Sequence, residues 1–238
     1  MSVVGLSQAV QQEVRVVKIR QVAVTVDRLD QATNFYRDVL QLPIHAQGEQ
    51  VTVTVGSSRL ILEAGDHFDG VHHVAFGIAP ADFEFTRGWL GQRVDPILVD
   101  GSEVIEGPEG WHSKSVYFLG PEDILLEFIA RDADDHALAS EADAPQPLSI
   151  SEVGIGVPDV AGAVATLTEQ FGLPAFPPQG THFAPVGGHD GLVILVDEER
   201  IWFPTASHQA ARGPVDLEIE GLRPARVSLT TRATVSAN

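Results

Sequence analysis

Three segments of the chain share one pattern, in which a polar residue is followed by an apolar or β-branched run. They are residues 21–26, 73–78 and 152–157, which open with Gln21, His73 and Glu152. A short apolar run of this kind predicts a mostly buried strand, here with a polar side chain at its start. Three copies of the pattern indicate an internal repeat, and the repeat sets the fold prediction.

Each predicted strand is followed by a predicted helix. In the first copy an apolar stripe begins at Ala32, and Asp27 is the expected N-cap. In the third copy Asp159 is the expected N-cap, and Gly172 follows the last apolar position as a C′ residue. The second copy predicts its helix over residues 80–92. Every copy therefore begins as a β-α unit.

Strand-like segments separated by short turns follow the helices. In the first two copies a glutamate, Glu63 or Glu127, lies seven residues after the turn glycine, near the end of the last strand. Each copy is thus a β-α-β-β-β unit, and units should pair because one unit cannot cover its own sheet face. The hairpin strands are expected at residues 51–55, 59–63, 115–119 and 124–128.

The units divide the chain into four parts. Copies one and two occupy residues 17–131 and are predicted to pair into the domain that holds the site. Residues 132–147 are rich in Asp, Ala and Pro and are predicted to be a linker. The third unit covers residues 148–221, and residues 222–238 are expected to form a C-terminal tail without clear pattern. The prediction is an α+β fold with three units.

Composition narrows the classes of function. The 238 residues include 33 acidic residues against 15 Lys plus Arg, and this charge of −18 disfavours nucleic-acid and anionic-membrane partners. No apolar stretch approaches ~18 residues, and residues 1–12 lack the features of a signal peptide. Without cysteine, any metal or substrate site must use His, Asp, Glu, Gln and aromatic side chains. These absences favour a cytoplasmic protein.

Three motifs follow one another along the chain: NFYRDVLQL at residues 34–42, HVAF at residues 73–76 and VYFLGPEDILLE at residues 116–127. In this order they resemble the motifs of the vicinal oxygen chelate superfamily, which includes glyoxalase I, extradiol ring-cleaving dioxygenases and the bleomycin and fosfomycin resistance proteins. The resemblance covers residues 17–131 closely and residues 148–221 weakly. It implies a glyoxalase-like fold in which two units pair into a curved sheet whose concave face holds a metal.

The resemblance also implies a set of metal ligands on the first and last strands of the paired units. Carried over position by position, they are Gln21, Glu63, His73 and Glu127. These nitrogen and oxygen donors suit a divalent Zn, Ni, Co, Fe or Mn ion with one or two waters. As a Lewis acid the metal would stabilise an enediolate-type intermediate of a small molecule with vicinal oxygens, while Glu63 or Glu127 moves a proton.

This ligand set favours a glyoxalase-like lyase or isomerase, and two alternatives stay open. One is an extradiol ring-cleaving dioxygenase, in which a histidine would stand at the position of Gln21. The other is a non-catalytic protein that binds a small molecule, as the bleomycin resistance proteins do. Taken singly, each of the four residues is more often a structural or surface group than a ligand.

The sequence also offers candidates for the substrate pocket and an indication of the oligomeric state. His72 should point to the opposite face of its strand from His73. The third unit has Glu152 at the first ligand position but Leu195 where a glutamate would be needed, so we expect it to hold no metal. The odd number of units favours pairing of the third unit with its counterpart in a second subunit, and so a homodimer. The expected substrate-binding residues are His45, Arg59, Phe76, Trp111, His112 and Tyr117.

Overall fold

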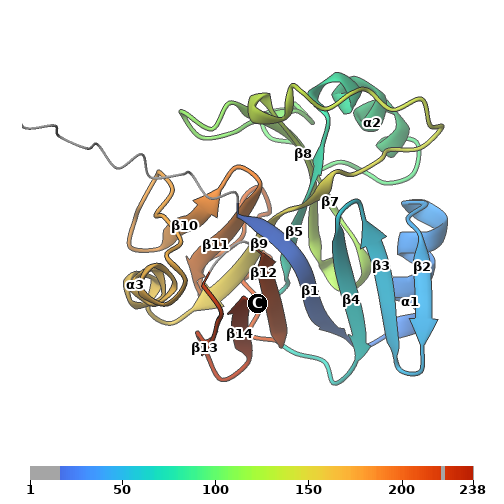
Figure 1. Cartoon of the computed structure of the whole chain (residues 1–238). Coiled ribbons are helices and arrows are strands. Elements are labelled where there is room, and N and C mark those ends of the chain that lie inside the picture. Colours follow the sequence, from blue (N-terminus) through green and yellow to red (C-terminus); the bar gives the residue numbers. More distant parts are fainter. Residues whose placement is uncertain (1–16, 221–222, 238) are drawn as a thin grey trace, which may run out of the picture.

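Two seven-stranded sheets form the body of the computed structural model (Figure 1), which describes residues 17–220 and 223–237. The β1 sheet has the strand order β13-β14-β12-β1-β4-β3-β2, and the β5 sheet has the order β10-β11-β9-β5-β8-β7-β6. The strands of the β1 sheet are β1 (Lys18–Val26), β2 (Ile44–Gln47), β3 (Gln50–Val55), β4 (Ser58–Ala64), β12 (Val215–Glu220), β13 (Ala225–Ser228) and β14 (Ala233–Ala237). Those of the β5 sheet are β5 (His73–Ile78), β6 (Ile105–Glu106), β7 (Ser113–Leu119), β8 (Leu125–Arg131), β9 (Ser149–Val157), β10 (Phe183–Gly188) and β11 (Gly191–Asp197).

Helices follow the first strand of three units, and this confirms the expected α+β fold of repeated β-α-β-β-β units in curved sheets. The third unit lacks one named strand and keeps only an isolated bridge between Ala175 and Val186 in its place. The helices are α1 (Leu29–Asn34) with a π-helical continuation (Phe35–Val39), α2 (Phe83–Leu90) and α3 (Val160–Phe171), and 3-10 turns lie at Pro80–Asp82, Pro121–Asp123 and Asp132–Asp134.

The expected pairing of the first and second units is wrong. Strand β1 is antiparallel to β12, whereas β5 of the second unit is antiparallel to β9 of the third unit. The physical reason lies in residues 215–237, whose three strands complete the β1 sheet and leave β5 to pair with β9. These strands include most of the segment that the sequence assigned to a patternless tail. Because both sheets are complete within one chain, the odd number of units no longer argues for a homodimer.

Of the two predicted N-caps, Asp159 of α3 is correct and Asp27 of α1 is wrong. At α3 the Asp159 side chain accepts a hydrogen bond from the Gly162 amide at 3.0 Å, and Gly172 has a φ of 78° after the last turn. At α1 the N-cap position belongs to Arg28, without a capping bond from its own side chain. The carboxylate of Glu122, from the second unit, instead accepts hydrogen bonds from the Asp27 and Arg28 amides.

One apolar core lies between the two sheets and reaches the three helices. Along β5 and β8, Val74, Phe76, Leu126 and Phe128 belong to this core. Since side chains alternate along a strand, His73 and Glu127 point to the other, concave face of the β5 sheet. Buried Ser58 ties the sheets together, because its hydroxyl donates to the Ile19 carbonyl and accepts from the Ile150 amide.

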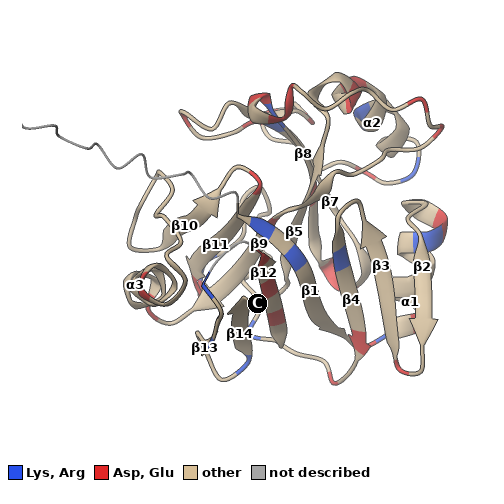
Figure 2. Ribbon diagram, viewed as in Figure 1, with Lys and Arg blue, Asp and Glu red and all other residues tan. Residues whose placement is uncertain are grey.

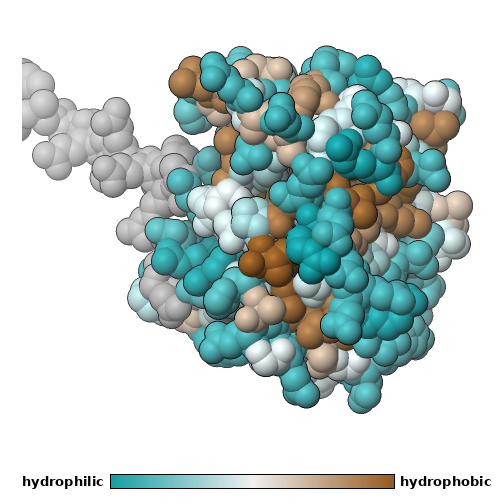
Figure 3. Space-filling model, turned by 90° about the vertical axis from the view of Figure 1, so that its right-hand side faces the viewer, coloured by the Kyte–Doolittle hydropathy of each residue, from teal (hydrophilic) through white to brown (hydrophobic). Residues whose placement is uncertain are grey.

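Acidic residues are spread over loops, helices and strands of the fold (Figure 2). On one face, hydrophobic side chains form a band bordered by hydrophilic ones (Figure 3). No helix in the described ranges is long and apolar enough to cross a membrane. The prediction about residues 1–12 and the unit boundary at residues 221–222 lie outside the described part of the chain.

Candidate metal centre

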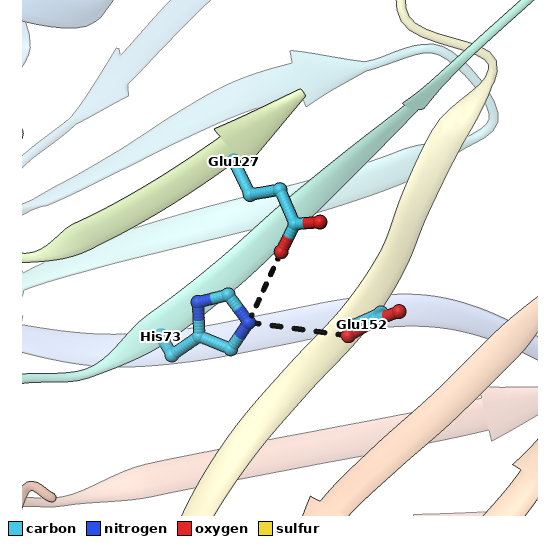
Figure 4. A group of neighbouring side chains, drawn as sticks. All are labelled: His73, Glu127 and Glu152. Carbon is cyan, nitrogen blue, oxygen red and sulfur yellow. Dashed lines mark ion pairs between the residues drawn. The ribbon is translucent and has the colours of Figure 1, made fainter. Parts of the chain in front are cut away.

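Three ionisable side chains meet on the concave face of the β5 sheet (Figure 4). His73, Glu127 and Glu152 each offer one ligand atom, and these atoms lie within 4.8 Å of one another. The His73 Nε2 atom is 3.5 Å from Glu127 Oε2 and 3.9 Å from Glu152 Oε2. All three residues are buried, with exposed fractions of 5%, 1% and 4%. Three strands from two units therefore build one compact donor group.

The strand register explains why these residues meet. Ala75 of β5 pairs with Glu127 on the parallel strand β8 and with Glu152 on the antiparallel strand β9. The register of β5 and β9 shifts between Ala75 and Phe76, so Ser151 is an extra residue on β9. Such a bulge re-aims the neighbouring side chains, and bulges are frequent beside active sites.

The His73 ring is oriented by the backbone. Its Nδ1 atom lies 3.3 Å from the Leu125 carbonyl oxygen, an acceptor that a proton on Nδ1 satisfies. That tautomer leaves the Nε2 lone pair facing the two carboxylates. A bond from one ring nitrogen to a backbone carbonyl is the usual support of a metal-binding histidine.

Glu127 is a buried carboxylate without ordinary partners. Neither of its oxygens accepts a hydrogen bond of normal geometry from the described residues. Burial, and after it the negative charge of Glu152, raises the pKa of Glu127 to about 7. A buried carboxylate that accepts no hydrogen bond is costly, so this position favours a proton or a nearby cation.

Glu152 is held differently, by a buried arginine. Arg131, which is 1% exposed, donates from Nη2 to Glu152 Oε1 and from Nε to Ser151 Oγ. Although burial opposes it, the charges of Arg131 and His73 lower the pKa of Glu152. For His73 burial lowers the pKa, but the hydrogen bond to Glu152 and the two carboxylate charges raise it above its ordinary value.

The donor set fits a divalent metal ion. With metal–ligand distances of about 2.1 Å, ligand atoms stand about 3.0 to 3.4 Å apart in octahedral or tetrahedral sites, close to the shorter distance here. The oxygens of Glu127, which accept no hydrogen bond from the described residues, and the Nε2 atom of His73, which faces both carboxylates, are the atoms that such an ion would use. One imidazole and two carboxylates suit Zn, Fe, Mn, Co or Ni, with room for further ligands.

A cavity of about 430 Å³ opens beside His73 and Glu152. Its size lies in the range of about 300–1,000 Å³ that is common for small-molecule sites. Ile194 of β11 borders it at the place that Glu127 has in the other half of the sheet, because Ile194 pairs with Gly154 as Glu127 pairs with Ala75. An apolar side chain there leaves a metal in the site with three protein ligands and open positions.

Two of the four expected ligands, Gln21 and Glu63, do not lie at this site. Both border a separate hollow of about 480 Å³ on the β1 sheet, where the exposed Glu63 accepts a hydrogen bond from Gln50. The turn between β3 and β4 has two unpaired residues, whereas that between β7 and β8 has five. Counting from the turn glycine therefore misaligned Glu63, and the residue in register with Glu127 is Ile61, which pairs with Ala23.

In the third unit, too, the strand register changes which residue stands at the ligand position. Leu195, expected at the ligand position, belongs to the core between the sheets, and Ile194 takes that position. A shift of one residue moves a side chain to the other face of a strand. The third unit was expected to hold no metal, but its Glu152 belongs to the candidate donor group with His73 and Glu127.

The expected substrate-binding residues are scattered. Trp111 and Tyr117 border the cavity, and the Tyr117 ring lies 6.3 Å from that of His73. His45 on β2 and Arg59 on β4 are exposed on the β1 sheet, and His112 is exposed in the loop before β7. Phe76 packs on Phe128 in the core, at 5.7 Å between ring centroids. Of the six expected residues, Trp111 and Tyr117 thus remain candidates for ligand contact.

Sequence reasoning missed three side chains of this region. Trp202 lies 5.2 Å from the His73 ring and donates from its indole nitrogen to the Val71 carbonyl. Arg200 borders the cavity, and Arg131 holds Glu152. Trp202 stands between Ile201 and Phe203 in a short apolar run that is visible in the sequence, whereas nothing in the local sequence marks either arginine.

Two solved structures of similar architecture cover most of the chain. A "putative dioxygenase" from Bacillus subtilis is 12% identical, with 94% of this chain and 86% of that chain covered and a TM-score of 0.59. Glyoxalase I from Zea mays is 15% identical, with 85% of this chain and 74% of that chain covered and a TM-score of 0.54. No protein-family model matches the sequence, and none of the curated proteins compared with it matches.

Proposed function

Because the chain has the fold of the vicinal oxygen chelate superfamily, we propose that it is a metal-dependent enzyme acting on a small molecule with two neighbouring oxygens. The observation that carries the proposal is the buried group of His73, Glu127 and Glu152, of which His73 and Glu152 line a cavity. With Ile194 at the fourth position, a bound metal would keep sites for two substrate oxygens.

The reaction best supported is that of a lyase or isomerase that moves a proton. A divalent ion at this site supplies Lewis acidity, which stabilises negative charge on substrate oxygens. Glu127 is suited to accept the substrate proton, because it is a buried carboxylate beside the donor group whose oxygens accept no hydrogen bond from the described residues. Trp111, Tyr117 and Trp202 line the cavity and exclude water from the reacting atoms.

A ring-cleaving dioxygenase is the second candidate. It is favoured by the number of ligands, since three side chains with open positions on one side resemble the two-histidine, one-carboxylate arrangement of iron oxygenases. This chain differs by having one histidine and two carboxylates. Oxygen consumption by the iron-loaded protein with a panel of catechols distinguishes the two reactions.

Metal titration of the purified chain tests the proposal. We expect one divalent ion to bind per chain, and His73→Ala and Glu127→Gln each to weaken binding by at least about 100-fold, as loss of a first ligand does. Gln21→Ala and Glu63→Gln serve as matched controls on the β1 sheet and should bind the ion as the unchanged chain does.

The outcomes separate the remaining alternative. Ligand binding without any requirement for metal would favour a non-catalytic binding protein. No uptake of Zn²⁺, Mn²⁺, Co²⁺, Ni²⁺ or Fe²⁺ by the folded chain would contradict the proposed enzyme.

A further inference from the structure

The cavity beside the donor group has a largely aromatic lining that carries one arginine. Besides Trp111, Tyr117 and Trp202, the side chains of Phe183 and Phe203 line it. Aromatic faces pack best against flat unsaturated groups, in offset-stacked or edge-to-face contact. The shape of the lining thus favours a planar, apolar ligand body over a flexible polar one.

Arg200 is the cation of this lining, and no carboxylate neutralises it. Its guanidinium lies 5.0 Å over the Phe183 ring, and Nη1 donates to the His182 carbonyl at 3.3 Å. No ion pair joins Arg200 to any residue in the described ranges, although the chain has 33 acidic residues. Glu106 also borders the cavity, but it is exposed on the edge strand β6. A half-buried guanidinium with free donors recognises carboxylates.

We propose that the ligand of this cavity is a flat unsaturated acid, with its carboxylate on Arg200 and its two neighbouring oxygens at the donor group. This assignment rests on the proposed function for the oxygens, but the carboxylate contact stands on Arg200 alone. The two ends of the ligand are therefore separable by experiment.

Binding of two related probes tests the assignment. 3,4-Dihydroxybenzoate and catechol share the ring and the vicinal hydroxyls and differ by the carboxylate. Two of the three tryptophans, Trp111 and Trp202, border the cavity, so quenching of intrinsic fluorescence reports binding. We expect the acid to bind the unchanged chain about tenfold to hundredfold more tightly than catechol, as one charge-assisted contact allows.

Variants at Arg200 identify the contact. Arg200→Gln should remove the preference for the acid and leave catechol binding unchanged, and Arg200→Lys should retain part of it. Arg59→Gln, at an exposed arginine on the β1 sheet, is the matched control and should retain all of it. Equal binding of both probes, equal weakening of both by Arg200→Gln, or binding of neither probe would overturn the assignment.

Titration of both probes with and without Zn²⁺ tests the Arg200 contact separately from the proposed metal-dependent function. A carboxylate preference that depends on Arg200 in the absence of any effect of Zn²⁺ supports the Arg200 contact and contradicts the metal-dependent function. Binding that Zn²⁺ strengthens, without a carboxylate preference, does the reverse.

Discussion

The two sheets have the same strand layout, but among the described residues only the β5 sheet builds a compact donor group. In each sheet two central strands run antiparallel to each other, and each is flanked on its other side by a parallel strand of its own half. This pairing aligns positions between the two sheets. Gln21, Ile61, Asp216 and Ser236 of the β1 sheet stand where the β5 sheet has His73, Glu127, Glu152 and Ile194.

The difference between the sheets lies in burial as much as in residue type. In the β1 sheet Asp216 pairs with Arg226 at 3.0 Å, and their side chains are 48% and 64% exposed. In the β5 sheet the side chains of Glu152 and Arg131 are only 6% and 1% exposed. The same strand layout thus yields a solvated surface pair in one place and a dry ionic cluster in the other. The loop residues Trp111 and Trp202 pack over the donor face of the β5 sheet and exclude water there.

Removing the arginine from each pair gives the largest expected contrast. Arg131→Met leaves Glu152 buried beside Glu127 without its cation, and we expect the metal-free chain to lose about 3–5 kcal/mol of unfolding free energy. Arg226→Met breaks an exposed pair and should cost at most about 1 kcal/mol. Urea denaturation with a chelator present measures both changes.

Added Zn²⁺ sharpens this contrast. Because a divalent cation compensates the two carboxylates, it should restore more stability to Arg131→Met than it gives the unchanged chain. A folded Arg131→Met variant as stable as Arg226→Met would show that the buried pair contributes little.

The pH dependence of stability should also differ between the sheets. The pKa of Glu127 is raised from 4.5 to about 7, so the folded chain keeps a proton that the unfolded chain releases. This contribution is present below pH 4.5 and is lost as the pH rises through 7, by up to about 3 kcal/mol. The raised pKa of His73 acts in the same direction above pH 6.5.

Comparison with Glu127→Gln isolates this effect in the metal-free chain. Buried His72, whose pKa burial lowers to about 4, acts oppositely between pH 4 and 6.5, but it is present in both proteins and cancels. Relative to Glu127→Gln, the unchanged chain should lose stability from pH 5 to pH 8. Asp216→Asn is the control from the β1 sheet, and a difference of the same size there would contradict the contrast.

Most of the fold followed from local pattern, but the pairing of units did not. The apolar runs of residues 21–26 and 73–78 predict strands correctly, and Asp159 and Gly172 correctly mark the two ends of α3. No helix lies among the described residues 215–220 and 223–237, so these strands do not visibly repeat the β-α-β-β-β unit. Pairing is decided by which sheet edges meet in space, and three strands from this segment complete the β1 sheet as a full unit would.

The candidate site was half visible for a related reason. His73 and Glu127 belong to one unit, whose internal register the motifs fix. Glu152 comes from the paired unit, and its position depends on the bulge at Ser151. Gln21 and Glu63 were misassigned because they obey the same pattern in the other sheet. Turn length, which sequence alone did not resolve, separates Glu63 from the position of Ile61.

A carboxylate at the fourth position gives the smallest expected effect and the sharpest test of the alignment. Ile194→Glu places a fourth donor opposite Glu127 in the cavity wall, and we expect Zn²⁺ affinity to rise by about tenfold, or about 1.4 kcal/mol. Ile61→Glu makes the same change at a similarly buried position of the β1 sheet, where Ile61 is 5% and Ile194 is 3% exposed. Competition with a chromogenic chelator measures both affinities. Since burial of the new carboxylate costs the metal-free chain similar stability in both variants, only convergence on His73 and Glu152 can make their Zn²⁺ affinities differ. Equal affinities in two folded variants would mean that the strand register does not align Ile194 with Glu127.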